Sequence, residues 1–340
     1  MHVRTGAMAE TEQDRVGSPV QRRDCEATGP GADSAESATL RRMGVARADI
    51  SFLLASRALG ASYEHTLMVG RQSLVATPAE VVDAYREVGQ PLGLSAAEQL
   101  VNTGDGYSEP LFRHLGAREI DSLDNSSYER ATIVHDLNEP LPEHRHGRYS
   151  VVFDGGSLEH VFNLPQALKN CMQAVAPGGH LITVTPANSF VGHGFYQFSP
   201  ELHYRALTPA NGFEMVTLLI RSGHKWSHWQ HVVDPESVRS RVTMETPWPT
   251  FLYVMAKRIS DVEPFAVWPQ QSDYQHVWDG GTYEMSQRTR GRIVAKLPGP
   301  LRKAIMVART STAVFGTTSG PNHFQRVSMI DVAQGATKHR

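Results

Sequence analysis

The 340-residue sequence predicts an α/β fold in which a mostly parallel, twisted sheet carries helices on both faces. Between residues 65 and 258, short apolar runs typical of buried parallel strands alternate with amphipathic helical segments. The connections between these segments are short, as they are in right-handed βαβ units. Hydrophobic residues make up 40% of the chain, which is enough to fill the core of one such domain.

Three regions are predicted along the chain. Residues 1–40 are poor in large apolar side chains, so we expect a disordered tail that buries too little surface to offset its ordering entropy. Residues 41–260 are predicted to form the sheet domain, with an insertion at 73–103. Residues 261–340 are predicted to form a partly irregular C-terminal extension, with a basic amphipathic helix over 300–315.

Composition and charge limit the classes of function. The chain has 33 Lys and Arg against 35 Asp and Glu, and this balance argues against a nucleic-acid partner, which normally needs a basic surface. No apolar run approaches the roughly 18 residues of a membrane span, and the start has no secretory signal. The two cysteines lie far apart, which argues against a disulfide scaffold. These features predict a cytoplasmic protein with no membrane partner.

The first elements of the sheet domain are an apolar helix over 50–59 and a short buried strand that stops at Gly70. Helices with side-chain caps follow, since a Ser or Thr before an apolar periodic segment accepts a hydrogen bond from the first helical turn. The predicted caps are Thr77 with Glu80 for a helix that ends at Gly89, Ser95 with Glu98 for a helix through Val101, and Ser108 for a helix that ends at Gly116.

Strands and helices alternate from residue 118 onward. The predicted strands are 118–124, 131–137, 149–155 and 180–187. The predicted helices are 163–175 and 199–207, the second of them capped by Ser199. Two late strands, 213–221 and 251–258, are joined by a long polar loop, so we expect them to pair antiparallel at one edge of the sheet.

Acidic residues end three successive predicted strands. Ligands of an open α/β sheet bind beyond the carboxyl ends of the strands, where the strand order reverses. Asp124, Asp136 and Asp154 stand at these positions, and packing alone does not require them. A carboxylate after the second strand suits the two hydroxyls of a ribose, and one after the third suits an adenine amino group. The alternative for each aspartate is an ordinary turn or helix cap.

Four segments of the sheet domain resemble motifs of the class I S-adenosylmethionine-dependent methyltransferases. They are 120–126 (IDSLDNS), 135–142 (HDLNEPLP), 149–162 (YSVVFDGGSLEHVF) and 176–182 (APGGHLI). The resemblance runs from about residue 65 to residue 258. It implies a Rossmann-like methyltransferase fold, S-adenosylmethionine as the cofactor and a small-molecule substrate.

The same resemblance implies roles for single residues. It places Asp124 on the cofactor ribose, Asp136 and Leu137 beside the adenine, and Glu159 and His160 near the methyl donor or the acceptor. Together with the other residues at the strand ends and in glycine turns, the predicted cofactor-binding set is Gly70, Arg71, Gly104, Gly106, Asp124, Asn125, Asp136, Leu137, Asp154, Gly155 and Glu159.

The glycine-rich first motif of the family is altered in this chain. Only Gly70 follows the first strand, and it precedes Asp124 by 54 residues, where a direct βαβ unit needs about 20. Gly104 and Gly106 lie closer, and Gly106 precedes Asp124 by 18 residues. We therefore predict a cofactor loop that is split between these two glycine turns, since glycine permits close backbone approach. The alternative is that residues 104–106 form a plain turn between helices.

Three residues are predicted as candidates for removing a proton from an acceptor: His160, His193 and Tyr196. A histidine suits this role because its ordinary pKa is about 6.5. His193 lies in the segment 191–201, whose glycines and aromatic residues suggest a lid, the alternative being an ordinary packing loop.

No metal site is predicted. Two groups of histidines lie close together in the sequence, and the second group has no acidic ligand near it and is interleaved with tryptophans. They are His144 and His146, and His224, His228 and His231.

The first functional prediction is methyl transfer from S-adenosylmethionine to a sugar, polyketide-like or other secondary-metabolite acceptor. The altered glycine motif motivates an alternative, a catalytically idle methyltransferase-like scaffold or partner subunit. A nicotinamide-dependent oxidoreductase is the third reading, and it is disfavoured because no G-x-G-x-x-G follows the first strand.

Overall fold

The computed structural model describes residues 44–102, 104–224, 227–239, 241–281, 298–301, 318–319 and 323–335. All of these residues belong to one compact unit of the chain. The predicted tail over 1–40 and nearly all of the helix predicted over 300–315 lie outside the described residues. None of the described helices is both long and apolar enough to cross a membrane.

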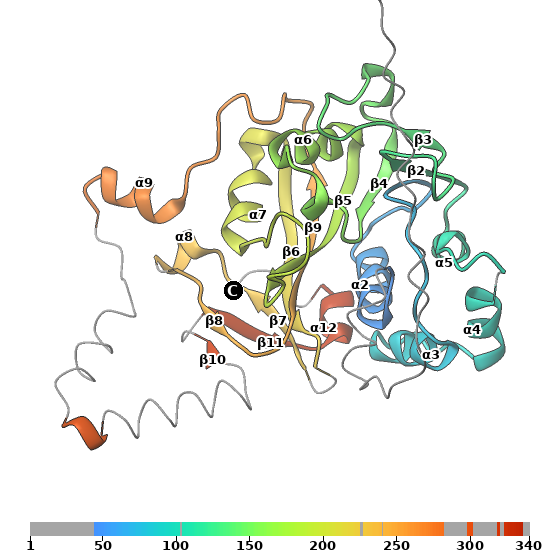
Figure 1. Cartoon of the computed structure of the whole chain (residues 1–340), viewed down its shortest axis with the longest axis horizontal. Helices are drawn as coiled ribbons and strands as arrows, with labels where there is room; N and C mark the ends of the chain where they lie inside the picture. Colours follow the sequence, from blue (N-terminus) through green and yellow to red (C-terminus); the bar gives the residue numbers. More distant parts are fainter. Residues whose placement is uncertain are drawn as a thin grey trace, which may run out of the picture. The chain divides into compact units, whose positions relative to one another are not determined.

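The unit is built on a nine-stranded sheet with the order β11-β7-β6-β9-β5-β4-β1-β2-β3 (Figure 1). Its strands are β1 (His65–Val69), β2 (Glu119–Asp124), β3 (Ile133–Val134), β4 (Tyr149–Asp154), β5 (Val175–Asn188), β6 (Phe213–Ser222), β7 (Trp229–Val232), β9 (Thr250–Arg258) and β11 (Phe324–Val327). Strands β1 to β5 pair in parallel. The order 3-2-1-4-5 is that of a doubly wound fold, and it reverses between β1 and β4.

The two late strands differ in part from the prediction. Strands β6 and β9 do pair antiparallel, but β9 also pairs antiparallel with β5, so it lies inside the sheet. The sheet continues past β6 through β7 to β11, which comes from the C-terminal extension. Strands β8 (Met244–Glu245) and β10 (Thr318–Ser319) form a separate antiparallel pair.

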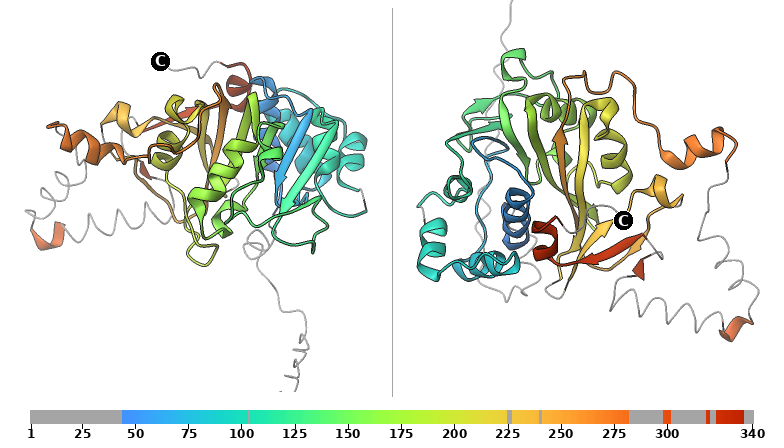
Figure 2. Two further views of the ribbon diagram at one scale, coloured as in Figure 1. Left: turned by 90° about the horizontal axis from the view of Figure 1, so that it is seen from above. Right: turned by 180° about the vertical axis from the view of Figure 1, so that it is seen from behind.

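Helices cover both faces of the sheet, as the alternating pattern predicts (Figure 2). Successive side chains of a strand point to opposite faces, so Val151 and Phe153 of β4 join one core cluster and Val152 joins the other. The first cluster includes residues of α2 (Arg47–Ala58), α3 (Pro78–Glu87), α4 (Leu94–Val101), α5 (Glu109–Leu115) and α12 (Met329–Ala333), and the second includes residues of α6 (Leu164–Ala174) and α7 (Pro200–Ala206). Two further short helices are α8 (Pro235–Val238) and α9 (Ser272–Trp278).

The predicted helix caps are partly correct. Thr77 accepts a hydrogen bond from the backbone of Glu80, and Ser199 caps α7 in the same way. Ser95 is not a cap, because α4 begins at Leu94 and Gly93 takes the cap position. Ser108 stands at the cap position of α5, but its hydroxyl donates to the carbonyl of Gln72 at 2.8 Å and leaves the helix uncapped by a side chain.

The strand predicted over 131–137 shrinks to the two residues of β3. Side-chain hydrogen bonds replace the strand ladder on both sides of it. On one side, the Thr132 hydroxyl accepts from the backbone of Ser122 at 2.8 Å. On the other, the Asp136 carboxylate accepts from the backbone of Asn138 at 2.9 Å and bends the chain into a turn. Asp136 therefore lies beyond the strand rather than at its end.

His203 of α7 makes the stability of the fold sensitive to acid. Its side chain is buried, and burial lowers the pKa of His203 to about 4. Between pH 6.5 and pH 4 the unfolded chain takes up a proton that the folded chain does not, so stability falls as the pH falls. The shift corresponds to about 3 kcal/mol over that window. We expect His203→Phe, measured by chemical denaturation at pH 7 and pH 4, to lose that part of the pH dependence. Equal pH dependence in both proteins would contradict this account.

Candidate functional site

A crevice of about 260 Å³ opens at the carboxyl ends of β1, β2 and β4, where the strand order reverses. We call it the switch-point crevice. It is lined by Gly70, Leu123, Asp124, Asn125, Asp136, Leu137, Asn138, Gly156, Ser157, His160 and Val161. Larger hollows on the described surface, such as one of about 380 Å³ beside α7, do not border the ends of the parallel strands.

The crevice brings together about half of the residues that the sequence singles out. Those that line it are Gly70, Asp124, Asn125, Asp136, Leu137 and His160. Those that do not are Arg71, Gly104, Gly106, Asp154, Gly155, Glu159, His193 and Tyr196. Sequence reasoning missed Ser157 and Val161, although both stand in or next to the segment that resembles a family motif.

Asp124 and Asp136 each use one carboxylate oxygen to hold the local chain. Asp124 Oδ1 accepts from the backbone of Ser126 at 2.8 Å, and Asp136 Oδ1 accepts from the backbone and side chain of Asn138. The hydrogen bonds from Asn138 lower the pKa of Asp136. Within the described residues, Oδ2 of both side chains makes no hydrogen bond, so each aspartate caps a turn with one carboxylate oxygen and has a second oxygen that is not used by the protein.

Gly70 lets the end of β1 approach the turn after β4. Its φ is +72°, and a Cβ at this position would lie 2.6 Å from Ser157 Oγ. An L side chain there is therefore excluded both by backbone conformation and by contact. Gly104 and Gly106 also have positive φ, but a Cβ on either would meet nothing within 4 Å. At these two positions glycine therefore permits the positive φ of the turn, and it does not permit a close approach to the crevice.

Asp154 was predicted as a strand end that faces the ligand, and the structure turns it inward. Its side chain is fully buried, and Oδ1 accepts from the backbone of Ser157 at 2.9 Å and of Leu158 at 3.3 Å. Asp154 thus holds the turn that follows β4. Gly155 within that turn lies over Phe153, whose ring would be 2.9 Å from a Cβ on the glycine. Both residues therefore stabilise the turn after β4, whose residues Gly156 and Ser157 line the crevice.

Arg71 fastens the 104–107 turn beside the crevice, and its donors are taken by protein groups. Its Nε donates to Glu109 at 2.6 Å, and one Nη donates to Asp105 at 3.2 Å. The guanidinium also lies 3.7 Å from the centroid of the Tyr107 ring. The 104–107 turn is therefore joined to the segment after β1 by Arg71 and by a backbone hydrogen bond of 2.8 Å from the N–H of Leu74 to the carbonyl of Gly106.

Replacing Arg71 tests this arrangement. We expect Arg71→Ala to cost about 2 kcal/mol of folding free energy, less than a fully buried pair because both partners keep some solvent contact. Arg86→Ala is the matched control, since Arg86 pairs with Asp83 on the exposed face of α3, where an ion pair contributes about 0.3–0.5 kcal/mol. Both are measured by chemical denaturation, and equal losses would show that the Arg71 network is not structural.

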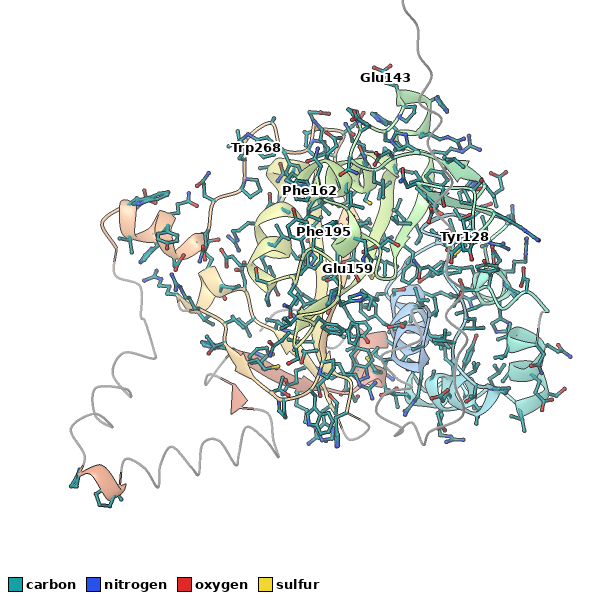
Figure 3. All side chains as sticks on the ribbon, viewed as in Figure 1. Tyr128, Glu143, Glu159, Phe162, Phe195 and Trp268 are labelled. Carbon is teal, nitrogen blue, oxygen red and sulfur yellow. The ribbon has the colours of Figure 1, made fainter. Side chains whose placement is uncertain are left out.

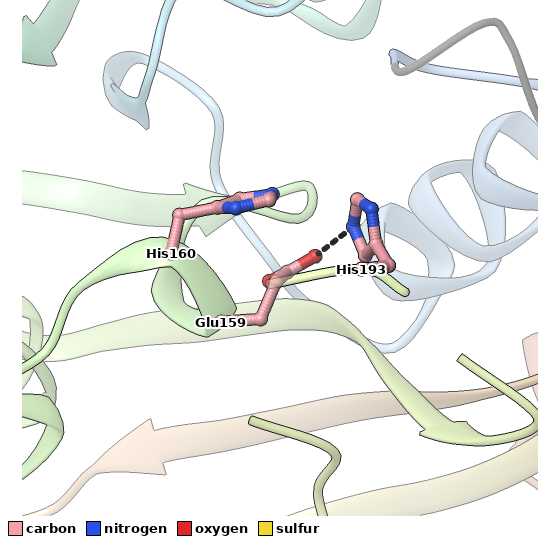
Figure 4. A group of neighbouring side chains, drawn as sticks. All are labelled: Glu159, His160 and His193. Carbon is pink, nitrogen blue, oxygen red and sulfur yellow. Dashed lines mark hydrogen bonds and ion pairs between the residues drawn. The ribbon is translucent and has the colours of Figure 1, made fainter. Parts of the chain in front are cut away.

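Three titratable side chains gather beside the crevice: Glu159, His160 and His193, which we call the Glu159 cluster (Figure 4). Glu159 and His160 belong to a short 3-10 turn after β4, and His193 comes from the loop after β5. Glu159 Oε1 lies 3.3 Å from His193 Nε2, and the two imidazole rings meet edge to face with centroids 4.7 Å apart. Burial raises the pKa of Glu159 and lowers the pKa of both histidines.

The loop that carries His193 is docked on the backbone of Glu159. The backbone N–H of Phe195 donates to the Glu159 carbonyl at 2.7 Å. Gly194 has a φ of +65°, and a Cβ there would lie 2.8 Å from that same carbonyl oxygen. This close approach sets the position of His193 against Glu159, although the two residues are 34 positions apart.

Phe162 and Phe195 lie near Glu159 (Figure 3), and Tyr196 is hydrogen-bonded to Phe162; we call these three residues the aromatic rim. Phe162 and Phe195 are 72% and 66% exposed, and their rings pack edge to face with centroids 5.7 Å apart. The Tyr196 hydroxyl donates to the carbonyl of Phe162 at 2.6 Å, so it braces the rim. The sequence predicted aromatic residues in the loop after β5 but did not single out Phe162. The exposure that makes Phe162 notable is visible only in the structure.

The strand order and the crevice at its switch point define a Rossmann-like, doubly wound α/β fold, which confirms the predicted fold class. No protein-family model matches the chain, and no curated protein matches it in sequence.

Solved structures that resemble this one include several transferases. One is Burkholderia thailandensis 1,6-didemethyltoxoflavin-N1-methyltransferase with bound 1,6-didemethyltoxoflavin and S-adenosylhomocysteine, at 13% identity over 69% of this chain and 94% of that chain, with a TM-score of 0.33. A second is a variant of a 16S rRNA (adenine(1408)-N(1))-methyltransferase from Catenulisporales acidiphilia, at 11% identity over 61% and 91%, with a TM-score of 0.31. A third is the branched-chain polyamine synthase from Thermus thermophilus with N4-aminopropylspermidine and 5'-methylthioadenosine, at 15% identity over 66% and 60%, with a TM-score of 0.32.

Proposed function

We propose that this chain is an S-adenosylmethionine-dependent methyltransferase that acts on a small-molecule acceptor. The observation that carries the proposal is the switch-point crevice. In it, Asp124 and Asp136 each have one carboxylate oxygen that makes no hydrogen bond, and Gly70 presents backbone without a side chain. An adenosyl group presents the matching chemistry, with two ribose hydroxyls for one acid and an adenine amino group for the other. Leu123, Leu137 and Val161 supply apolar walls for the base.

S-adenosylmethionine supplies, when bound, a methyl group on a positively charged sulfur that needs little further activation. The protein then has to bind the cofactor, align the acceptor, exclude water and remove a proton. His160 lines the crevice and belongs to the Glu159 cluster, so we assign proton removal to that cluster. We assign Tyr196 a positioning role rather than proton removal, because its hydroxyl already donates a hydrogen bond to the carbonyl of Phe162.

The aromatic rim favours an acceptor with a flat, apolar face. Exposed phenyl rings stack on such faces and on the C–H face of a sugar, which agrees with a secondary-metabolite or sugar acceptor. A toxoflavin precursor is the ligand of one similar structure, whereas a second similar protein is named for rRNA. The formal net charge of -2 supports the small-molecule class for this chain.

The idle-scaffold alternative has one specific observation in its favour, since Gly104 and Gly106 do not line the crevice. Calorimetry of the full chain with S-adenosylmethionine, S-adenosylhomocysteine and a nicotinamide dinucleotide separates the three functions. We expect S-adenosylhomocysteine to bind with a Kd on the order of micromolar. Absence of heat with either sulfur ligand would support the scaffold, and tighter binding of the dinucleotide would support an oxidoreductase.

A further inference from the structure

We propose that the Glu159 cluster binds a divalent transition-metal ion, for which Zn²⁺ is the best fit, at the edge of the switch-point crevice. No metal site is predicted from the spacing of histidines in the sequence, because the ligands come from two loops. Glu159, His160 and His193 each offer one ligand atom, and these three atoms all lie within 4.8 Å of one another. Two imidazoles with one carboxylate form a donor set that suits zinc and related metals.

The distances within the cluster agree with a zinc site. Zinc binds imidazole nitrogen and carboxylate oxygen at about 2.0–2.2 Å, so ligand atoms in a tetrahedral site lie about 3.3–3.5 Å apart. The separation between Glu159 Oε1 and His193 Nε2 is 3.3 Å. All three ligand atoms lie within 4.8 Å of one another, and His160 is the most exposed of the three side chains, so it has the most room to adjust on binding.

A second observation points to a cation, and it concerns the charge of Glu159. Its side chain is only 2% exposed, and Oε2 has no hydrogen-bond partner among the described residues. The neighbouring carboxyl of Asp154 is fully buried as well. Buried acids of this kind are costly unless a positive charge compensates them. Within the described residues, the ion pairs of Glu159 include His193 and no Lys or Arg.

Two of the three ligands, Glu159 and His193, are held in place before any metal binds. Gly194 and Phe195 dock the His193 loop on the Glu159 carbonyl, and the backbone N–H of His193 donates to the carbonyl of Phe190 at 3.0 Å. Preorganised ligands lose little conformational freedom on binding, which favours a metal site over a chance cluster.

Three protein ligands leave at least one coordination position open, as catalytic zinc sites do. A metal held there would lower the pKa of a bound acceptor hydroxyl by stabilising the oxyanion, and the proton would pass to solvent water. The cluster would then assist proton removal through the metal rather than through a free imidazole. This role rests on the proposed methyl transfer, whereas the metal site itself does not.

The test is a titration of the metal-free full chain with Zn²⁺ and, in parallel, with Co²⁺. We expect one equivalent to bind and the Co²⁺ complex to show the visible absorption of a four- or five-coordinate ion. Glu159→Gln and His193→Asn are each expected to weaken binding by more than about 100-fold, since loss of outer-shell partners already costs about 10–100-fold. His65→Ala is the matched control, because His65 and Glu119 form an exposed pair at 3.2 Å.

Several outcomes overturn the proposal. They are no stoichiometric binding, equal binding by the folded Glu159→Gln and His193→Asn variants, or loss of binding in the His65→Ala control. If Glu159→Gln does not fold, His193→Asn still decides, because His193 lies on a loop. S-adenosylhomocysteine binding is measured on the same proteins, and His193→Asn is expected to retain it, because His193 does not line the crevice. Metal binding without cofactor binding would refute only the methyltransferase proposal, and the reverse would refute only the metal site.

Discussion

Replacing Asp124 with alanine is expected to weaken S-adenosylhomocysteine binding by about 10- to 150-fold. The carboxylate accepts hydrogen bonds from the ribose in the proposed complex, and a hydrogen bond to a charged group is worth about 1.5–3 kcal/mol. Asp124 Oδ1 already accepts a hydrogen bond from the backbone N–H of Ser126, so the ribose hydroxyls are expected to donate to Oδ2. Calorimetry with the full chain measures the effect.

Two further variants separate the ligand contact from the turn. Asp124→Asn keeps the Oδ1 acceptor for the Ser126 turn and loses the charge, so we expect an affinity between those of the wild type and Asp124→Ala. Glu119→Ala removes a carboxylate from the exposed start of the same strand, β2, and is expected to leave the affinity unchanged. Equal affinity of Asp124→Ala and the wild type would remove Asp124 from the cofactor site.

The second large effect is expected on stability, in Phe153→Ala. Phe153 of β4 is fully buried, and its ring packs on Phe112 with centroids 5.4 Å apart. Truncation of a buried phenylalanine costs about 3–5 kcal/mol, because a cavity remains in addition to the lost apolar burial. Gly155 lies directly over this ring, so we also expect the turn that carries Glu159 to loosen.

The control removes the same phenyl group from the surface. Phe162→Ala changes a side chain that is 72% exposed, and we expect less than about 0.5 kcal/mol. Chemical denaturation at pH 7 compares the three proteins. A similar loss in both variants would mean that the core on this face of the sheet is not packed as described.

Several parts of the fold that follow from local patterns were predicted correctly, although the caps predicted at Ser95 and Ser108 were not. The apolar run of β1 and the capping box at Thr77 act within a few residues of one another, so their signals are complete in the sequence. The strand predicted over 131–137 was wrong in extent, because side-chain hydrogen bonds from Thr132 and Asp136 compete with the ladder. That competition depends on Ser122, which lies on the neighbouring strand.

The candidate site divides in the same way. The sequence singled out Asp124 and Asp136 because both follow apolar runs. In the structure, both line the crevice. Asp154 follows an apolar run too, yet its carboxylate is buried beneath the turn that it caps. Nothing in the pattern of β4 distinguishes an acid that faces a ligand from one that faces its own backbone. The path of the turn over Phe153 decides which way the carboxylate of Asp154 points.

By itself, the sequence determined the alternation of strands and helices, the doubly wound class, and the position of Asp124 and Asp154 at the ends of β2 and β4. These properties depend on periodicity and capping over short stretches of chain. Only the tertiary structure decided that Arg71 binds Glu109 and that His193 reaches Glu159. Such pairs are set by loop paths and by close backbone approach at glycines such as Gly194, and short-range patterns do not record how distant segments pack.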